Sequence, residues 1–250
     1  MRCDPFNLRD VERALAGADV AHYPLSATSS RLTQGRAADL DLLCADTLAR
    51  AANTTGVKKI VCAAPPPEEV SRTFDLHGVR WVVSPGASAK VSEEDPWGAR
   101  SVQRLPLPRG RDASWVAAEY ARWLPRFMRP FLRVDVDESR TCRFYFRPLK
   151  KPLLVLTFAA DRSSADRQLF YVTGGLLTGS IRADARPRLE FRSVLDRTVV
   201  LSAVHDFVPR LPWFVYRLTQ APIHLVVMSG FARHLARAKH VLPMPLTSPE

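Results

Sequence analysis

Four polar residues near the C-terminal end of the chain are the best candidates for contact with a ligand. His205 precedes Asp206 at the expected end of a strand, which fits either a catalytic dyad or polar side chains that close the rim of a sheet. Gln220 and His224 stand four residues apart in a helical pattern, so they share one helix face. The predicted ligand pocket is lined by His205, Tyr216, Gln220 and His224. The alternative is a filled core in which the same side chains only pack.

The segments that carry these residues predict a long helix held by a curved sheet. A helical pattern runs from about residue 212 to 238, and its apolar stripe consists of Phe214, Leu218, Ala221, Leu225, Met228, Ala232 and Leu235. The preceding strand alternates Leu201, Ala203, His205 and Phe207. We expect the two sets to face each other, with the small Ala203 and Ala221 leaving space for an apolar cavity.

The rest of residues 101–240 completes a helix-grip pattern. A strand at 101–107 is followed by a helix at 113–128 that bends at Pro125. Further strands are predicted at 131–136, 142–146, 153–158, 168–172, 188–194 and 199–207. In a helix-grip fold, a curved antiparallel sheet wraps the terminal helix, so this part is expected to be an α+β domain.

The first 86 residues alternate helices with short apolar strands, as parallel β-α-β units do. Helices are predicted at 8–15, 37–55 and 67–76, and strands at 18–23, 57–63 and 79–84. Gly56 is expected to end the second helix. We therefore predict an α/β domain with a partial Rossmann-like parallel sheet at 1–86, a linker at 87–100, the helix-grip domain at 101–240 and a tail at 241–250.

Two segments of the first domain carry a family resemblance. Residues 8–20 read LRDVERALAGADV after Cys3-Asp4, and residues 51–61 read AANTTGVKKIV. They resemble the third strand to the fifth strand of the extended or atypical short-chain dehydrogenases, which are NAD(P)-binding, epimerase-like proteins. The resemblance implies an oxidoreductase or epimerase ancestry.

The second domain resembles the START-like and polyketide-cyclase-like C-terminal domain of unknown function that follows some of these dehydrogenases. The residues that carry this similarity are FVPRLPW at 207–213, Ile223-His224 through Met228, and FARHL at 231–235. Domains of this kind imply a pocket for an apolar ligand.

The chain departs from the dehydrogenase pattern at its chemical centre. Its 11 glycines form no G-x-G or G-x-x-G pair, so the phosphate cradle of the family's N-terminal segment is missing. None of the five tyrosines is followed four residues later by the catalytic lysine. We assign no catalytic, cofactor-binding or metal-binding residue. No cofactor is expected for this chain alone, and NAD(P) only if an upstream segment exists.

Charge is distributed unevenly along the chain. Residues 1–100 contain 12 Lys or Arg and 13 Asp or Glu, whereas residues 101–250 contain 24 and 12. Arg122, Arg126, Arg129 and Arg133 recur at near-helical spacing among aromatic residues, which fits either a surface for anionic lipid or an ordinary solvated face. We expect no nucleic-acid partner, and the sequence does not determine an oligomeric state.

The four cysteines are scattered, and the N-terminus carries no signal-peptide pattern, so we expect a cytoplasmic protein, with peripheral membrane association left open. The leading functional hypothesis is an NAD(P)-binding, epimerase-like protein, inactive or truncated, with an attached apolar-ligand domain. The alternative is a non-enzymatic carrier of a hydrophobic small molecule acting through residues 101–250.

Overall fold

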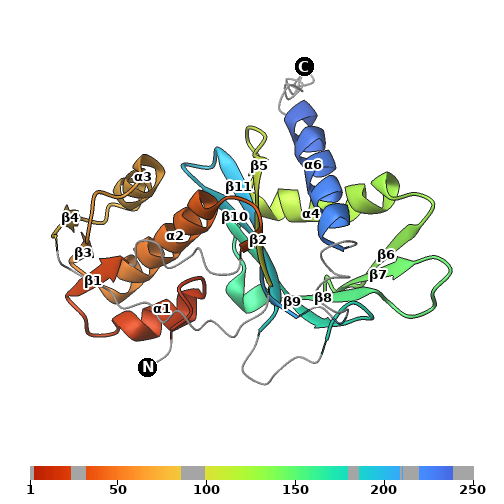
Figure 1. Cartoon of the computed structure of the whole chain (residues 1–250), viewed down its shortest axis with the longest axis horizontal. Helices are drawn as coiled ribbons and strands as arrows, with labels where there is room; N and C mark the ends of the chain where they lie inside the picture. Colours follow the sequence, from red (N-terminus) through yellow and green to blue (C-terminus); the bar gives the residue numbers. More distant parts are fainter. Residues whose placement is uncertain are drawn as a thin grey trace, which may run out of the picture.

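The computed structural model describes residues 3–23, 32–85, 99–179, 186–208, 210 and 220–238. Within these residues, the chain is a mixed α/β protein with a three-stranded parallel sheet and an eight-stranded, mostly antiparallel sheet (Figure 1). The predicted linker at 87–100 falls almost entirely outside the described residues, as do Phe214, Leu218 and the tail.

The first unit, within residues 3–85, contains three helices and the parallel sheet, and the second unit, within residues 99–238, contains most of the large sheet. Strands β1 (Val20–Tyr23), β3 (Lys59–Cys62) and β4 (Trp81–Val83) lie in the order β1-β3-β4, and all pairs are parallel, as predicted. The helices are α1 (Leu8–Leu15), α2 (Ala37–Thr55) and α3 (Glu68–Leu76). Gly56 ends α2 in the left-handed conformation with φ of 77°, where its N–H donates to the Ala52 carbonyl.

The eight-stranded sheet has the order β2-β5-β11-β10-β9-β8-β7-β6. Its strands are β2 (Leu32–Gln34), β5 (Ala99–Pro106), β6 (Leu132–Val136), β7 (Cys142–Phe146), β8 (Leu154–Phe158), β9 (Arg167–Gly174), β10 (Arg188–Val194) and β11 (Val199–Phe207). Consecutive strands from β6 to β11 pair antiparallel.

Two helices pack on one face of this sheet. They are α4 (Ala113–Phe127), whose N-terminus is capped by the Asp112 side chain, and α6 (Gln220–Ala238). The sheet curls around them, while α1 and α2 lie on its other side (Figure 1). A curled antiparallel sheet with a terminal helix against it is consistent with a helix-grip-like fold.

Strand β2 joins the two units. It precedes α2 in the first unit, yet it pairs parallel with β5 at the edge of the large sheet. This strand was not expected from the sequence pattern. Its three residues are too few to show an alternating pattern.

The expected facing of β11 toward the terminal helix was wrong for Leu201, Ala203 and His205, whereas Phe207, which follows a register shift in β11, packs against the core that includes α6. Leu201 and Ala203 belong to the apolar core shared with the first unit, and the His205 ring lies tilted against the ring of Phe6 in that unit. On α6, the buried residues are Val227, Met228, Phe231 and Leu235, whereas Leu225 is 48% exposed. Both faces of the sheet are covered by other elements. The alternating pattern along β11 shows which side chains share a face, but it does not show which helices cover that face.

Candidate functional site

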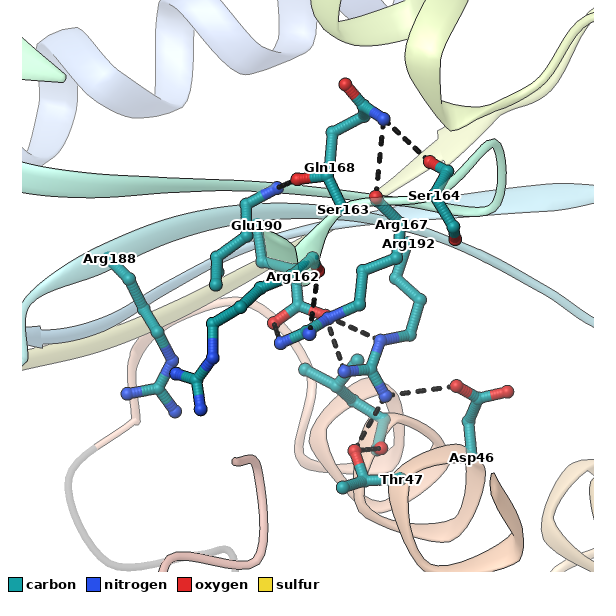
Figure 2. A network of polar contacts seen from close by, with 12 residues as sticks. Asp46, Thr47, Arg162, Ser163, Ser164, Arg167, Gln168, Arg188, Glu190 and Arg192 are labelled. Atoms are coloured by element: carbon teal, nitrogen blue, oxygen red, sulfur yellow. Dashed lines mark hydrogen bonds and ion pairs between the residues drawn. The ribbon is translucent and has the colours of Figure 1, made fainter. Parts of the chain in front are cut away.

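A cluster of buried charged side chains lies where α2 packs on the large sheet. Because Arg188, Glu190 and Arg192 alternate on β10, all three face the first unit. Figure 2 shows Glu190 and Arg192 directed from the sheet toward Asp46 and Thr47 on α2. Arg192 donates from Nη1 to Asp46 Oδ2 over 3.0 Å and to Thr47 Oγ1 over 2.6 Å. Its Nε donates to Glu190, so one wholly buried guanidinium connects both units.

The carboxylates of this cluster are held in their charged form. Burial opposes ionisation of Asp46, but hydrogen bonding with His77 and the charges of Arg192 and Arg50 together lower its pKa below the usual value. Burial also opposes ionisation of Glu190, and the Arg192 and Arg167 guanidinium groups lower its pKa in the same way. These acids are therefore permanent counter-ions of the arginines at neutral pH.

Two further arginines of the sheet reach acids of the first unit. Arg188 donates to Asp4 Oδ2 and to Asp206 Oδ2, each over 2.7 Å. Arg104 on β5 donates to Asp39 over 2.7 Å and, through both terminal nitrogens, to Glu69 over 2.8 and 2.6 Å. We name the contacts of Arg188 with Asp4, of Arg104 with Asp39 and Glu69, and of Arg192 with Asp46 the inter-unit ion pairs.

The inter-unit ion pairs give a structural account of part of the charge asymmetry in the sequence. Their arginines come from the sheet, and Asp4, Asp39, Asp46 and Glu69 come from the first unit. The sequence-based expectations did not include this interface between the first unit and the large sheet. The alternating charges at positions 188, 190 and 192, with Leu189 and Phe191 between them, are the signal that could have indicated it.

His205 is wholly buried, and its ring lies 5.2 Å from the ring of Phe6. Neither ring nitrogen has a hydrogen-bond partner among the described residues. Burial and the nearby Arg188 charge lower its pKa well below the usual value, so the ring is neutral. Asp206 pairs with Arg188, and no His205–Asp206 hydrogen bond forms. The adjacent pair is therefore not arranged as a catalytic dyad.

The other predicted pocket residues lie apart from His205. His224 is on α6, across the sheet, where its Nδ1 is 2.8 Å from Gln34 Oε1 of β2. Burial lowers the pKa of His224 to about 4. Tyr216 lies outside the described residues, and Gln220 begins α6 with a side chain that is also outside them. The structure thus does not bring His205 and His224 into one pocket.

A strip of uncharged polar side chains lies on the sheet face that α6 covers. Val102 and Ala203 point to the first unit, so their neighbours along β5 and β11 point to the α6 side, where Leu105 and Val200 contact the helix core. We define the α6 polar strip as Gln34, Ser101, Gln103, Ser202 and His224. Ser101 Oγ and Gln103 Nε2 are buried and have no hydrogen-bond partner among the described residues.

Two surface pockets among the described residues lie away from the α6 polar strip. One has a volume of about 330 Å³ and is lined by Arg133, Tyr145, Arg147, Pro148, Leu149 and Lys150. The other, of about 380 Å³, is lined by Arg9, Asp161, Arg162, Tyr171 and Arg186. The described residues contain no group of His, Cys, Asp or Glu side chains that could hold a metal ion. Within the same residues, no helix has the length and apolar character needed to cross a membrane.

Comparisons with known proteins give one relative of similar extent. No protein-family model matches the chain. The auxiliary protein GraX of Staphylococcus aureus is 27% identical over 248 residues, which is 92% of this chain and 77% of that protein. The crystal structure of DynU16, from the dynemicin biosynthetic locus, covers 57% of this chain and 48% of its own at 17% identity and a TM-score of 0.33. A TM-score this low carries no argument.

Proposed function

We propose that the chain is a non-enzymatic binding protein that receives a small amphipathic molecule beneath α6. The observation that carries the proposal is a pair of buried polar atoms in the α6 polar strip, Ser101 Oγ and Gln103 Nε2, that have no hydrogen-bond partner within the described part of the chain. A buried polar group without a partner costs about 1–3 kcal/mol. A bound molecule whose polar end contacts both atoms would remove this cost.

The composition of the α6 polar strip indicates the class of ligand. Serine and glutamine side chains are uncharged, and the low pKa of His224 keeps its ring neutral near pH 7. The adjoining core residues on this face, Leu105, Val200 and Met228, are apolar. The proposed ligand therefore has an apolar body and an uncharged polar end such as a hydroxyl or carbonyl group.

The similarity to GraX, which is named as an auxiliary protein, is compatible with this proposal. The START-like resemblance of the second domain also favours a ligand between the helix and the sheet. Under this proposal, the dehydrogenase-like first unit is a support for the sheet, and nucleotide binding would require the glycine-rich segment of that family.

Fluorescence titration with 1-pyrenebutanol, which joins an apolar ring system to a hydroxyl group, tests the proposal. We expect saturable binding to the wild type and roughly tenfold weaker binding to the Ser101→Ala/Gln103→Leu variant, since two hydrogen bonds are lost. The variant should keep or gain stability toward urea, because it no longer buries unpartnered atoms.

The matched control is Thr157→Val/Thr173→Val, which removes two hydroxyl groups that bond each other on β8 and β9. This control should bind the probe as the wild type does. Absence of saturable binding, or equal affinity in all three proteins, would exclude a site at the α6 polar strip.

A further inference from the structure

An exposed group of apolar and basic side chains lies at the edge of the large sheet formed by β6 and β7. We define the β6–β7 patch as Phe131, Arg133, Phe146, Arg147, Leu149 and Lys150. Phe131, Phe146 and Leu149 are 54%, 39% and 46% exposed. Large apolar side chains gathered on a surface in this way often mark an interaction site.

Backbone hydrogen bonds hold the β6–β7 patch together. The Arg147 N–H donates to the Phe131 carbonyl over 2.8 Å, and the Leu149 N–H donates to the Phe146 carbonyl over 2.7 Å. The rings of Phe131 and Phe146 stack with their centroids 6.1 Å apart. The two stacked rings therefore form one apolar surface, and the backbone bond to Phe146 holds Leu149 in the turn that follows β7.

The basic residues gather around Leu149, which lines the same pocket. Arg133, Arg147 and Lys150 line the pocket of about 330 Å³, and the Arg133 guanidinium lies 4.5 Å from the centre of the Tyr145 ring. Arg133 also pairs with Asp135 over 3.0 Å, so one acid partly offsets its charge. The charged side chains that line the pocket are all cationic, and its volume is sufficient for a phosphate group.

Of the four arginines that recur at near-helical spacing in the sequence, only one belongs to the β6–β7 patch. Arg133 belongs to the β6–β7 patch, whereas Arg122 is bonded to Glu119 within α4. Helix α4 ends at Phe127, so the row does not lie along one helix. Exposed Arg126 and Arg129 precede the β6–β7 patch in sequence.

We propose that the β6–β7 patch docks the chain on an anionic lipid bilayer. Phe131, Phe146 and Leu149 would enter the interfacial region, and the cations would bind lipid phosphates around them. Apolar side chains beside cations match a bilayer better than an acidic protein segment, which would satisfy the cations alone. The β6–β7 edge also lies at the end of the molecule opposite the first unit, where a flat surface can approach it (Figure 1).

Co-sedimentation of the full chain with vesicles tests this proposal. We expect binding to vesicles of phosphatidylcholine and phosphatidylglycerol in equal amounts, and none to phosphatidylcholine alone. The Arg133→Gln/Arg147→Gln/Lys150→Gln variant should bind about 100-fold more weakly. The Phe131→Ser/Phe146→Ser/Leu149→Ser variant should also lose binding, and its deficit should persist at high salt, where screening weakens only the charge contribution.

The matched control for charge is Arg72→Gln/Arg80→Gln/Arg233→Gln, which removes three exposed cations outside the β6–β7 patch. It should lose less than about threefold in affinity, because distant charges are screened. Equal binding by the charge variant and this control would overturn the proposal. So would vesicle binding that survives the serine substitutions while soluble poly-glutamate binds equally well, a result that identifies an acidic protein segment as the occupant.

Discussion

The large sheet buries polar side chains on its face toward the first unit, and it does so in two different ways. On the face toward the first unit, Arg192 and Glu190 are wholly buried, yet each contacts a group of opposite charge. His205 lies on the same face, and neither of its ring nitrogens bonds to a residue that the structure describes. Charges are costly to bury unless they are paired, so Arg192 and Glu190 are tolerated through their partners, while His205 is tolerated by remaining neutral.

Replacement of His205 by phenylalanine should stabilise the fold. The Phe ring keeps the tilted contact with Phe6 and removes two nitrogens that have no partner among the described residues, so the free energy of unfolding at pH 7 should rise by about 1 kcal/mol. Because the folded pKa of His205 is lowered, only the unfolded state takes up a proton as the pH falls below about 6.5. The advantage of the variant should then grow by up to about 1.4 kcal/mol per pH unit.

Urea denaturation at several pH values between 7.5 and 5 measures this effect. His22→Phe on β1 is the control, because the His22 side chain is exposed in the folded chain. A His205→Phe variant less stable than the wild type at pH 7 would show that the imidazole nitrogens make a favourable contact in solution.

At the scale of elements, the short strand β2 determines how the first unit meets the large sheet. The chain turns from β2 into α2 at Gly35, whose φ is 108°. A Cβ atom at this position would lie 1.9 Å from the Val102 carbonyl oxygen on β5. Glycine is thus required both by the backbone conformation and by the close approach of β5.

The Gly35→Ala variant is expected to separate β2 from β5. We predict a loss of stability of several kcal/mol, together with faster amide exchange along the β5 edge, measured by hydrogen exchange. Gly17→Ala is the matched control, since Gly17 also has a positive φ of 75° but nothing within 4 Å of the added Cβ. The control should lose only about 1–2 kcal/mol. Similar losses for both variants would mean that the β2–β5 contact is unimportant.

Local pattern predicted the elements of this chain better than their assembly. The limits of α1, α2, β10 and β11 were predicted from periodicity and from Gly56, which are properties of adjacent residues. The partner of each face was not predicted, because Arg192 meets Asp46 from 146 positions away. The pocket prediction depended on the same missing information, so His205 and His224 were grouped although they lie on opposite faces.

At the scale of the molecule, the inter-unit ion pairs join both units into one body. We predict that Arg192→Met lowers the free energy of unfolding by about 3–5 kcal/mol, because it leaves buried Asp46 and Glu190 with fewer counter-charges. Arg9→Met is the control, since Arg9 also pairs across the units, with Asp161, but both side chains are at least 60% exposed. The control should change stability by less than about 1 kcal/mol in urea denaturation. Equal effects would argue against a joining role for Arg192.

The position of α2 also affects synthesis on the ribosome. Its charged and apolar face is covered by β10 and β11, which end at Phe207, about 150 residues after the helix ends at Thr55. At translation rates of about 5–20 residues per second, this face stays uncovered for roughly 8–30 s after the helix is made. During that interval, Leu40, Leu43 and Asp46 have none of their partners from the sheet. Chaperones that hold nascent chains should therefore raise the yield of this protein more than that of a protein whose helices are covered by neighbouring strands.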